Sequence, residues 1–221
     1  MNNEVTAGYH RHANGGGIVQ DTAQVDDTAY VGRSARVLGH SRVLEHAMVY
    51  GRAQMAENAL LSGHSEAYGN AFLYGNSIVY GNAEVFENAH ILGNARLCGF
   101  ARLYGDAKVF GNARLSGSAR VFGNARLSGS AEVLGNVNLC ENSLVHGGSW
   151  DVSPLYIQGS RHRLCACSPT EIAIGCEIHT IDEWMRKFRV IGSAFGYTPE
   201  QIEEYKLYIL VFHKRYGQGC K

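Results

Sequence analysis

A six-residue period organises most of this 221-residue chain. From Ala23 to Gly148, a small residue recurs at every sixth position through 21 consecutive hexads without insertion or deletion. An aliphatic residue follows two positions later in every hexad except the one that contains Ala67. Apolar residues two positions apart lie on the same face of a strand, whereas a helix needs spacings of three or four. The period therefore predicts short strands joined by tight corners, the pattern of a parallel β-helix.

Three hexads form one triangular coil of 18 residues, so residues 18 apart are expected to stack at the spacing of about 4.8 Å between neighbouring strands. About seven coils would give a prism roughly 34 Å long. The corners carry Gly-Asn pairs, and both residue types tolerate the positive φ of a tight turn. Asparagines stacked at the corners are expected to form hydrogen-bonded ladders along the axis. The two ladder columns are Asn58, Asn76, Asn94 and Asn112, and Asn70, Asn88, Asp106, Asn124 and Asn142.

Repeated units of the form V-x-G-N-A-R resemble hexapeptide-repeat, left-handed β-helix proteins over residues 17–148. The resemblance, and not the period itself, implies a left-handed coil and a homotrimer. Its known members include trimeric acyltransferases, a carbonic anhydrase and non-catalytic scaffolds. The flanking motifs HRHANGGG at residues 10–17 and IGCxxHxxxxW at residues 174–184 are similar to uncharacterised repeat proteins of phages and prophages.

The chain is expected to contain an arm, a coil and a cap. Trp150 follows the last hexad and is expected to plug the end of the coil. Thr180 and Thr198 each precede a helical pattern as N-cap residues, and Gly192 is expected to end the first helix. The expected parts are an N-terminal arm at 1–16, a β-helix at 17–148 and an α+β cap at 149–221, with short strands within 155–178 and helices at 181–191 and 199–215.

Composition indicates which partners and which cellular location to expect. The 20 basic and 20 acidic residues give a net charge of zero, which does not indicate binding to nucleic acid. No apolar signal region or long apolar run is present, so neither secretion nor a membrane span is expected. The six cysteines, among them Cys220, are expected to be reduced thiols, as in a cytoplasmic protein. If a phage encodes the chain, the expected location is the cytoplasm of the host.

Two groups of residues, one of histidines and one of cysteines with a histidine, are weak candidates for metal ligands. His40, His46 and His64 occupy the slot that elsewhere holds Asn, which favours simple replacement at corners of positive φ. The second set has a loosely zinc-like composition, but the C-x-C spacing is atypical of zinc sites. Its members are Cys165, Cys167, Cys176 and His179.

Alternation along residues 171–178 would place Cys176 on the apolar face of a strand. A nucleophile and base pair of Cys176 with His179 lacks an orienting group and an oxyanion hole. No metal, cofactor or catalytic residue is therefore assigned.

Outward positions carry two patterns that are expected to form surfaces. We call the first the ring column, and it consists of Tyr50, Tyr68, Phe86, Tyr104 and Phe122. Its rings either stack only to stiffen the sheet or, as we favour, become buried in a subunit interface. We call the second the basic belt, and it consists of Arg96, Arg102, Lys108, Arg114, Arg120 and Arg126. The belt either pairs with Glu and Asp of neighbouring coils or, together with Tyr104 and Phe122, binds an anionic ligand in clefts between subunits.

Three function classes compete. The favoured one is a non-catalytic binding or scaffold protein, a homotrimer that binds an anionic, nucleotide-like small molecule or a host protein, as a phage-encoded sequestering or counter-defence factor would. An acyltransferase that uses acyl-CoA at the inter-subunit cleft is the first alternative, but such enzymes usually interrupt the coil with a catalytic loop, and here 21 hexads run unbroken. A structural β-helix component is the second alternative.

Overall fold

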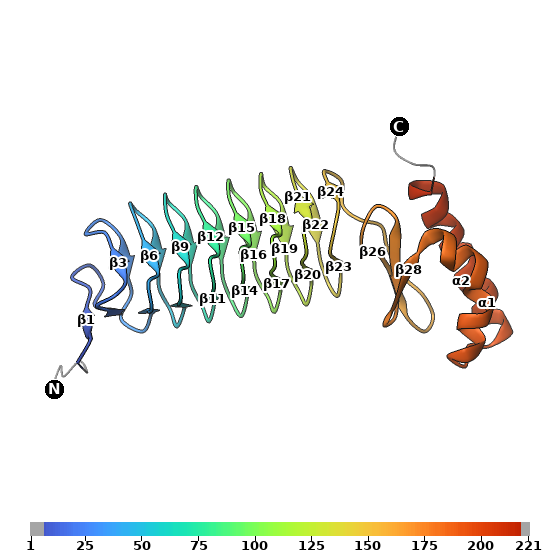
Figure 1. The fold of residues 1–221 in the computed structure, drawn as a ribbon, viewed down its shortest axis with the longest axis horizontal. Helices are drawn as coiled ribbons and strands as arrows, with labels where there is room; N and C mark the ends of the chain where they lie inside the picture. The colour runs from blue at the N-terminus through green and yellow to red at the C-terminus, as the bar shows by residue number, and fades with distance from the viewer. Residues whose placement is uncertain (1–6, 218–221) are drawn as a thin grey trace.

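The computed structural model describes residues 7–217 and confirms a parallel β-solenoid of about seven coils. A small antiparallel sheet and two helices follow the coil as a cap, and the N-terminal hairpin lies at the opposite end (Figure 1). The first six residues of the expected arm and Cys220 lie outside the described residues. The left hand of the coil stays a prediction from the resemblance.

Every third strand belongs to the same face of the solenoid, so the coil has three flat faces. The first face contains β1 (Tyr9–Arg11), β2 (Ile18–Gln20), β5 (Arg36–Val37), β8 (Gln54–Met55), β11 (Phe72–Leu73), β14 (His90–Ile91), β17 (Lys108–Val109), β20 (Arg126–Leu127) and β23 (Leu144–Val145). The second contains β3 (Gln24–Val25), β6 (Arg42–Val43), β9 (Leu60–Leu61), β12 (Ile78–Val79), β15 (Arg96–Leu97), β18 (Arg114–Leu115), β21 (Glu132–Val133) and β24 (Ser149–Trp150). The third contains β4 (Tyr30–Val31), β7 (Met48–Val49), β10 (Glu66–Ala67), β13 (Glu84–Val85), β16 (Arg102–Leu103), β19 (Arg120–Val121) and β22 (Asn138–Leu139).

The register confirms the 18-residue coil. Arg102 pairs with Glu84 on one side and with Arg120 on the other, and the same spacing recurs on all three faces. The small and aliphatic positions fill the axis, where nearly all of them are fully buried. The last coil is one residue shorter, because Glu132 pairs with Ser149, which lies 17 positions later.

The corners differ from the expectation in one respect. From Gly39 to Glu141, every corner of the coil has positive φ at its first residue, which is usually Gly, and no Asn or His adopts positive φ in residues 7–217. Four corners have Glu at that position with φ between 53° and 61°, namely Glu45, Glu57, Glu87 and Glu141. The interpretation that His40, His46 and His64 replace Asn at positive φ is therefore wrong, since the left-handed residue of each of these corners is the one before the histidine.

Asparagines of the second corner position form the first predicted ladder in full and the second one as far as Asp106 among the described residues. Asn58 donates to Asn76 over 3.0 Å, and Asn76 donates to Asn94 over 3.1 Å. Asn94 continues the first ladder to Asn112 over 3.1 Å. In the second ladder, Asn70 bonds to Asn88 and Asn88 to Asp106. Hydrogen bonds between side-chain amides of successive coils, and not backbone conformation, account for Asn at this position.

One buried serine offers a test of the core. Ser41, Ser65 and Ser143 occupy small positions, and their hydroxyls donate to the carbonyl three residues earlier over 2.6–2.7 Å. The buried Oγ of Ser77 has no hydrogen-bond partner among the described residues. We expect Ser77→Ala to raise the free energy of unfolding by about 1–3 kcal/mol, because it removes an unsatisfied buried hydroxyl.

The measurement is urea denaturation followed by circular dichroism. Ser65→Ala is the matched control, because it removes a hydroxyl that is already bonded. The control is expected to lower stability by about 1 kcal/mol or to leave it unchanged. A Ser77→Ala protein that unfolds at lower urea than the wild type would contradict the expectation.

The N-terminal arm closes the first end of the coil. β1 pairs antiparallel with β2, as Tyr9 lies opposite Gln20. The imidazole Nε2 of buried His12 lies 3.1 Å from the carbonyl oxygen of Ala29. A Cβ at Gly15 would lie 2.4 Å from the carbonyl oxygen of Val31, so the glycines of this arm allow its backbone to lie directly on the first coil.

The cap contains β25 (Tyr156–Gln158), β26 (Arg163–Ala166), β27 (Glu171–Ile174), β28 (Glu177–Thr180), α1 (Ile181–Ala194) and α2 (Pro199–Tyr216). The single strand expected over residues 171–178 is wrong, because a turn at Gly175, with φ of 62°, makes it a hairpin. α1 also continues through Gly192 to Ala194. Thr180 and Thr198 cap the two helices as predicted. Among residues 7–217, neither helix combines the length and apolar character needed to cross a bilayer.

Candidate functional site

The ring column forms a continuous stack on the third face. Successive ring centroids are 4.8–5.0 Å apart, and successive planes differ by at most 5° from Tyr50 to Phe122. Each ring is half-buried by its neighbours. Both interpretations of the column include such stacking, and burial in a subunit interface stays a prediction.

Two tyrosines of the column bond to carboxylates of the neighbouring outward column. Tyr50 Oη donates to Glu66 over 2.7 Å, and Tyr68 Oη donates to Glu84 over 3.2 Å. Burial and the nearby carboxylates raise the pKa of both phenols, that of Tyr68 to about 12. Both hydroxyls therefore stay protonated donors near neutral pH. The Tyr104 hydroxyl, two coils after Tyr68, has no such bond among the described residues.

The basic belt consists of three like-charged pairs, one on each face. Arg96 pairs in register with Arg114, Arg102 with Arg120, and Lys108 with Arg126. Two members have an acidic partner: an Arg102 guanidinium nitrogen lies 2.7 Å from a Glu84 carboxylate oxygen, and an Arg114 nitrogen lies 3.1 Å from a Glu132 oxygen. Within residues 7–217, the other four members have no carboxylate within 4 Å. On the second and third faces, one member of each basic pair is thus neutralised by a Glu of a neighbouring coil, as the first interpretation of the basic belt expects.

The first face lacks this neutralisation. Its outward column runs from Phe72 through His90 and Lys108 to Arg126. The rings of Phe72 and His90 stack with centroids 5.2 Å apart. Burial, and then the Lys108 charge, lower the pKa of His90, so its imidazole is neutral near pH 7.

Exposed aromatic residues lie beside this first-face column. Tyr74 and Phe110 occupy the second outward position of the same face and are 38% and 36% exposed. A cationic pair with no carboxylate within 4 Å in residues 7–217 therefore lies on the same face as accessible rings.

The corner histidines stack but do not form a metal centre. The rings of His46 and His64 are 5.2 Å apart and nearly parallel. They line an open hollow of about 480 Å³ together with Asn14, Tyr30 and Glu66. Nowhere in residues 7–217 do three or more His, Cys, Asp or Glu side chains lie close enough together to hold a metal ion.

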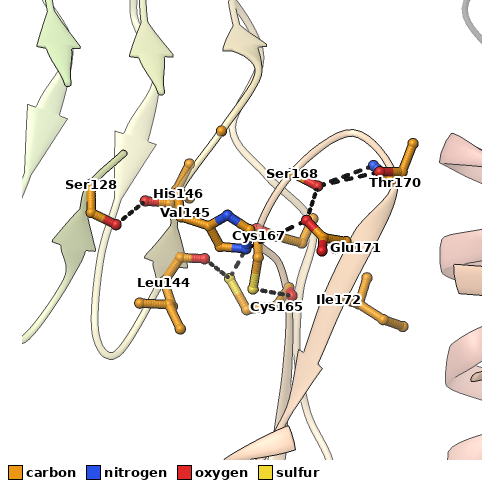
Figure 2. Close-up of polar contacts among 12 residues, drawn as sticks. Ser128, Leu144, Val145, His146, Cys165, Cys167, Ser168, Thr170, Glu171 and Ile172 are labelled. Atoms are coloured by element: carbon orange, nitrogen blue, oxygen red, sulfur yellow. Dashed lines mark hydrogen bonds and ion pairs between the residues drawn. The ribbon is translucent and has the colours of Figure 1, made fainter. Parts of the chain in front are cut away.

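The cysteine candidates are dispersed. Cys165 and Cys167 are buried where the cap meets the last coil, and the Sγ of Cys165 lies 3.9 Å from the carbonyl oxygen of Leu144 (Figure 2). Burial raises the pKa of both thiols, that of Cys167 to about 12, so neither is a thiolate at neutral pH. Cys176 is exposed in the β27–β28 turn. It therefore does not lie on the apolar face of a strand, contrary to the prediction from the alternation. His179 instead lies between Glu177, 3.4 Å away, and Glu183, 3.5 Å away.

A polar cluster joins the coil to the cap at the same junction. Figure 2 shows His146 of the last coil beside Glu171 of β27, with nitrogen and oxygen 3.6 Å apart. Ser168 donates to the Glu171 carboxylate over 2.8 Å, and the amide of His146 donates to the carbonyl of Cys167 over 2.9 Å. These bonds hold the cap on the coil.

The cap encloses an apolar cavity of about 70 Å³ that no sequence motif indicated. Trp184, Phe188 and Ile209 line it, and the imidazole Nδ1 of His162 at its edge lies 2.6 Å from the hydroxyl of Tyr197. The helical patterns after Thr180 and Thr198 predicted the two helices, α1 and α2, whose side chains line much of this cavity. The position of His162 depends on tertiary packing, for which the sequence contains no local pattern.

Comparison with known proteins adds no assignment, because neither a protein-family model nor a curated protein matches this sequence.

Proposed function

We propose that the protein is a non-catalytic binding protein whose first face holds an anionic, nucleotide-like small molecule, in the manner of a phage-encoded sequestering factor. The observation that carries the proposal is the in-register pair of Lys108 and Arg126, which has no carboxylate within 4 Å in residues 7–217. Two cations on adjacent strands repel each other, and a bound phosphate would convert this repulsion into attraction.

The neighbouring rings suit the remainder of a nucleotide. Phe110 and Tyr74 present accessible aromatic surface on the same face, against which a base can stack. A base stack on such a ring is worth about 1–3 kcal/mol. The unbroken coil supports binding over acyl transfer, since no loop interrupts the strands between β3 and β23.

The test measures affinity for cyclic dinucleotides and ADP-ribose by thermal shift and calorimetry. We expect at least one of them to raise the melting temperature, since a ligand that binds only the folded state stabilises it. The double variant Lys108→Glu with Arg126→Glu should weaken this binding by about a hundredfold or more, because it removes two charge-assisted contacts. Arg42→Glu, a charge reversal on the second face, is the matched control and should bind as the wild type does.

Three outcomes would overturn the proposal. Stabilisation by acetyl-CoA alone would favour the acyltransferase alternative. An unchanged affinity in the double variant would remove the first-face site. No response to any nucleotide, with recovery of one specific host protein on the immobilised wild type, would favour a protein partner instead.

A further inference from the structure

The four charged residues of one outward column on the third face change sign at the middle of their series. Beside the ring column, the first outward position is occupied by two acidic residues and then by two basic residues, at consecutive strands of the face. In order along the axis, this outward column reads Tyr30, Met48, Glu66, Glu84, Arg102, Arg120 and Asn138. The midpoint of the four charged residues lies between β13 and β16, with Tyr30 and Met48 before them and Asn138 after them.

The inner charges of this series satisfy each other, whereas the outer ones do not. Glu84 and Arg102 form an ion pair of 2.7 Å within the chain. Glu66 accepts a hydrogen bond from Tyr50, but no basic side chain lies within 4 Å of it in the described part of the chain. Arg120 likewise has no carboxylate neighbour there. One acidic and one basic residue are thus left without an opposite charge at equal distances from the midpoint.

A two-fold axis that lies in the plane of the interface, parallel to the strands and level with this midpoint, would match opposite charges. It would bring β13 opposite β16 of a second copy, and β10 opposite β19. Glu84 would then face Arg102 of the other copy, and Glu66 would face Arg120. The rings would face rings, since Phe86 would lie opposite Tyr104 and Tyr68 opposite Phe122.

A parallel arrangement around a three-fold axis has the opposite consequence. With the third faces turned to that axis, each strand would lie at the level of its own equivalents. Glu84 would meet Glu84, and Arg120 would meet Arg120. Like charges placed directly opposite across an interface cost binding energy and suppress that arrangement.

We propose that the third face is a self-association surface that binds the same face of a second copy in antiparallel orientation. The contact covers the half-buried ring column and gives Glu66 and Arg120 their missing partners. Six strands from β7 to β22 take part, over a length of about 24 Å at the usual strand spacing. An isologous pair of this kind is the commonest form of oligomer. The proposal concerns a different face from the ligand site proposed above and does not depend on it.

Sedimentation velocity on the full chain tests the proposal through a charge swap. The wild type is expected to approach twice the 24.1 kDa mass of one chain as concentration rises. Glu66→Arg alone and Arg120→Glu alone should each weaken self-association by about a hundredfold or more, because each creates two like-charge contacts across the two-fold axis. The double variant with both changes should restore the wild-type dimer, since the opposite charges are again matched.

Mixing the two single variants gives the sharpest outcome. One chain then has Arg at both positions and the other has Glu at both, so the mixture should form a heterodimer although each variant alone stays monomeric. Arg42→Glu, a charge reversal on the second face, should dimerise as the wild type does. Circular dichroism checks that every variant keeps the coil, as is expected for solvent-facing substitutions.

Several results would overturn the proposal. A wild-type trimer with no rescue in the double variant would support the parallel arrangement that the resemblance implies. A wild type that is monomeric at all concentrations, single variants that associate normally, or a mixture that stays monomeric would each exclude the antiparallel pair. Ligand binding measured on the first face would be unaffected by any of these results.

Discussion

Replacing Trp150 with alanine is expected to lower the free energy of unfolding by about 3–5 kcal/mol, because it removes a large buried side chain and leaves a cavity. Trp150 is only 5% exposed. Its indole Nε1 donates to the carbonyl oxygen of Gly147 over 2.9 Å. Its ring meets that of Tyr216, at the end of α2, edge to face with centroids 6.0 Å apart. One side chain therefore closes the coil and contacts the cap.

Urea denaturation followed by circular dichroism measures this effect. Val152→Ala is the matched control, since Val152 lies two residues away and is 59% exposed. The control should change stability by no more than about 0.5 kcal/mol. Trp150→Phe keeps an aromatic ring but loses the bond to Gly147, so it should fall between the two. Equal unfolding midpoints for Trp150→Ala and Val152→Ala would show that the end of the coil does not depend on this plug.

The coil could be predicted from sequence because its rule is local and repeats. Each hexad places one small and one aliphatic residue inward, so an unbroken count fixes every strand and every partner 18 residues away. The stacking of Tyr50 on Tyr68 and the bond from Asn58 to Asn76 follow from that count alone. The shortened register at Ser149 lies where the hexads end, so it could not be predicted in the same way.

Corner conformation was less predictable, because Gly and Asn share a tolerance for positive φ and the sequence does not say which of the two uses it. The structure assigns positive φ to the first corner residue, including Glu57 at 61°. The cap was also predicted only in part. Its alternating apolar residues fit one strand over 171–178, and Gly175 was the local signal for the turn that divides it.

The stacking of the rings and the register of the basic belt follow from the 18-residue count, but the individual acidic partners of the belt were not named from it. Glu84 and Glu132 lie 18 residues from Arg102 and Arg114, so the same count could have predicted both ion pairs. Once these pairs are assigned, Lys108 and Arg126 are distinguished from the rest of the belt. The positions of the ion pairs thus place the ligand-binding hypothesis on the first face and the self-association hypothesis on the third face.

Substituting Gly117 with alanine is expected to lower the free energy of unfolding by about 2–3 kcal/mol, through left-handed strain and a close backbone contact. Gly117 has a φ of 71°, and an added Cβ would lie 2.8 Å from the backbone nitrogen and oxygen of Gly135 in the next coil. Neither atom belongs to a flexible side chain. Relief would therefore require the two coils to move apart and weaken the bonds between their strands.

Two further substitutions, measured by the same urea denaturation, separate the causes of that loss. Gly147→Ala adds the same methyl group outside the left-handed region, where the nearest atom, Cβ of Ser168, lies 3.8 Å away, so it should be neutral or stabilising by up to about 1 kcal/mol. Glu57→Gly relieves a left-handed residue but makes the unfolded chain more flexible, so these effects should offset to within about 1 kcal/mol. If Gly117→Ala proved as stable as Gly147→Ala, neither backbone strain nor the close approach of stacked corners would explain why Gly dominates this position.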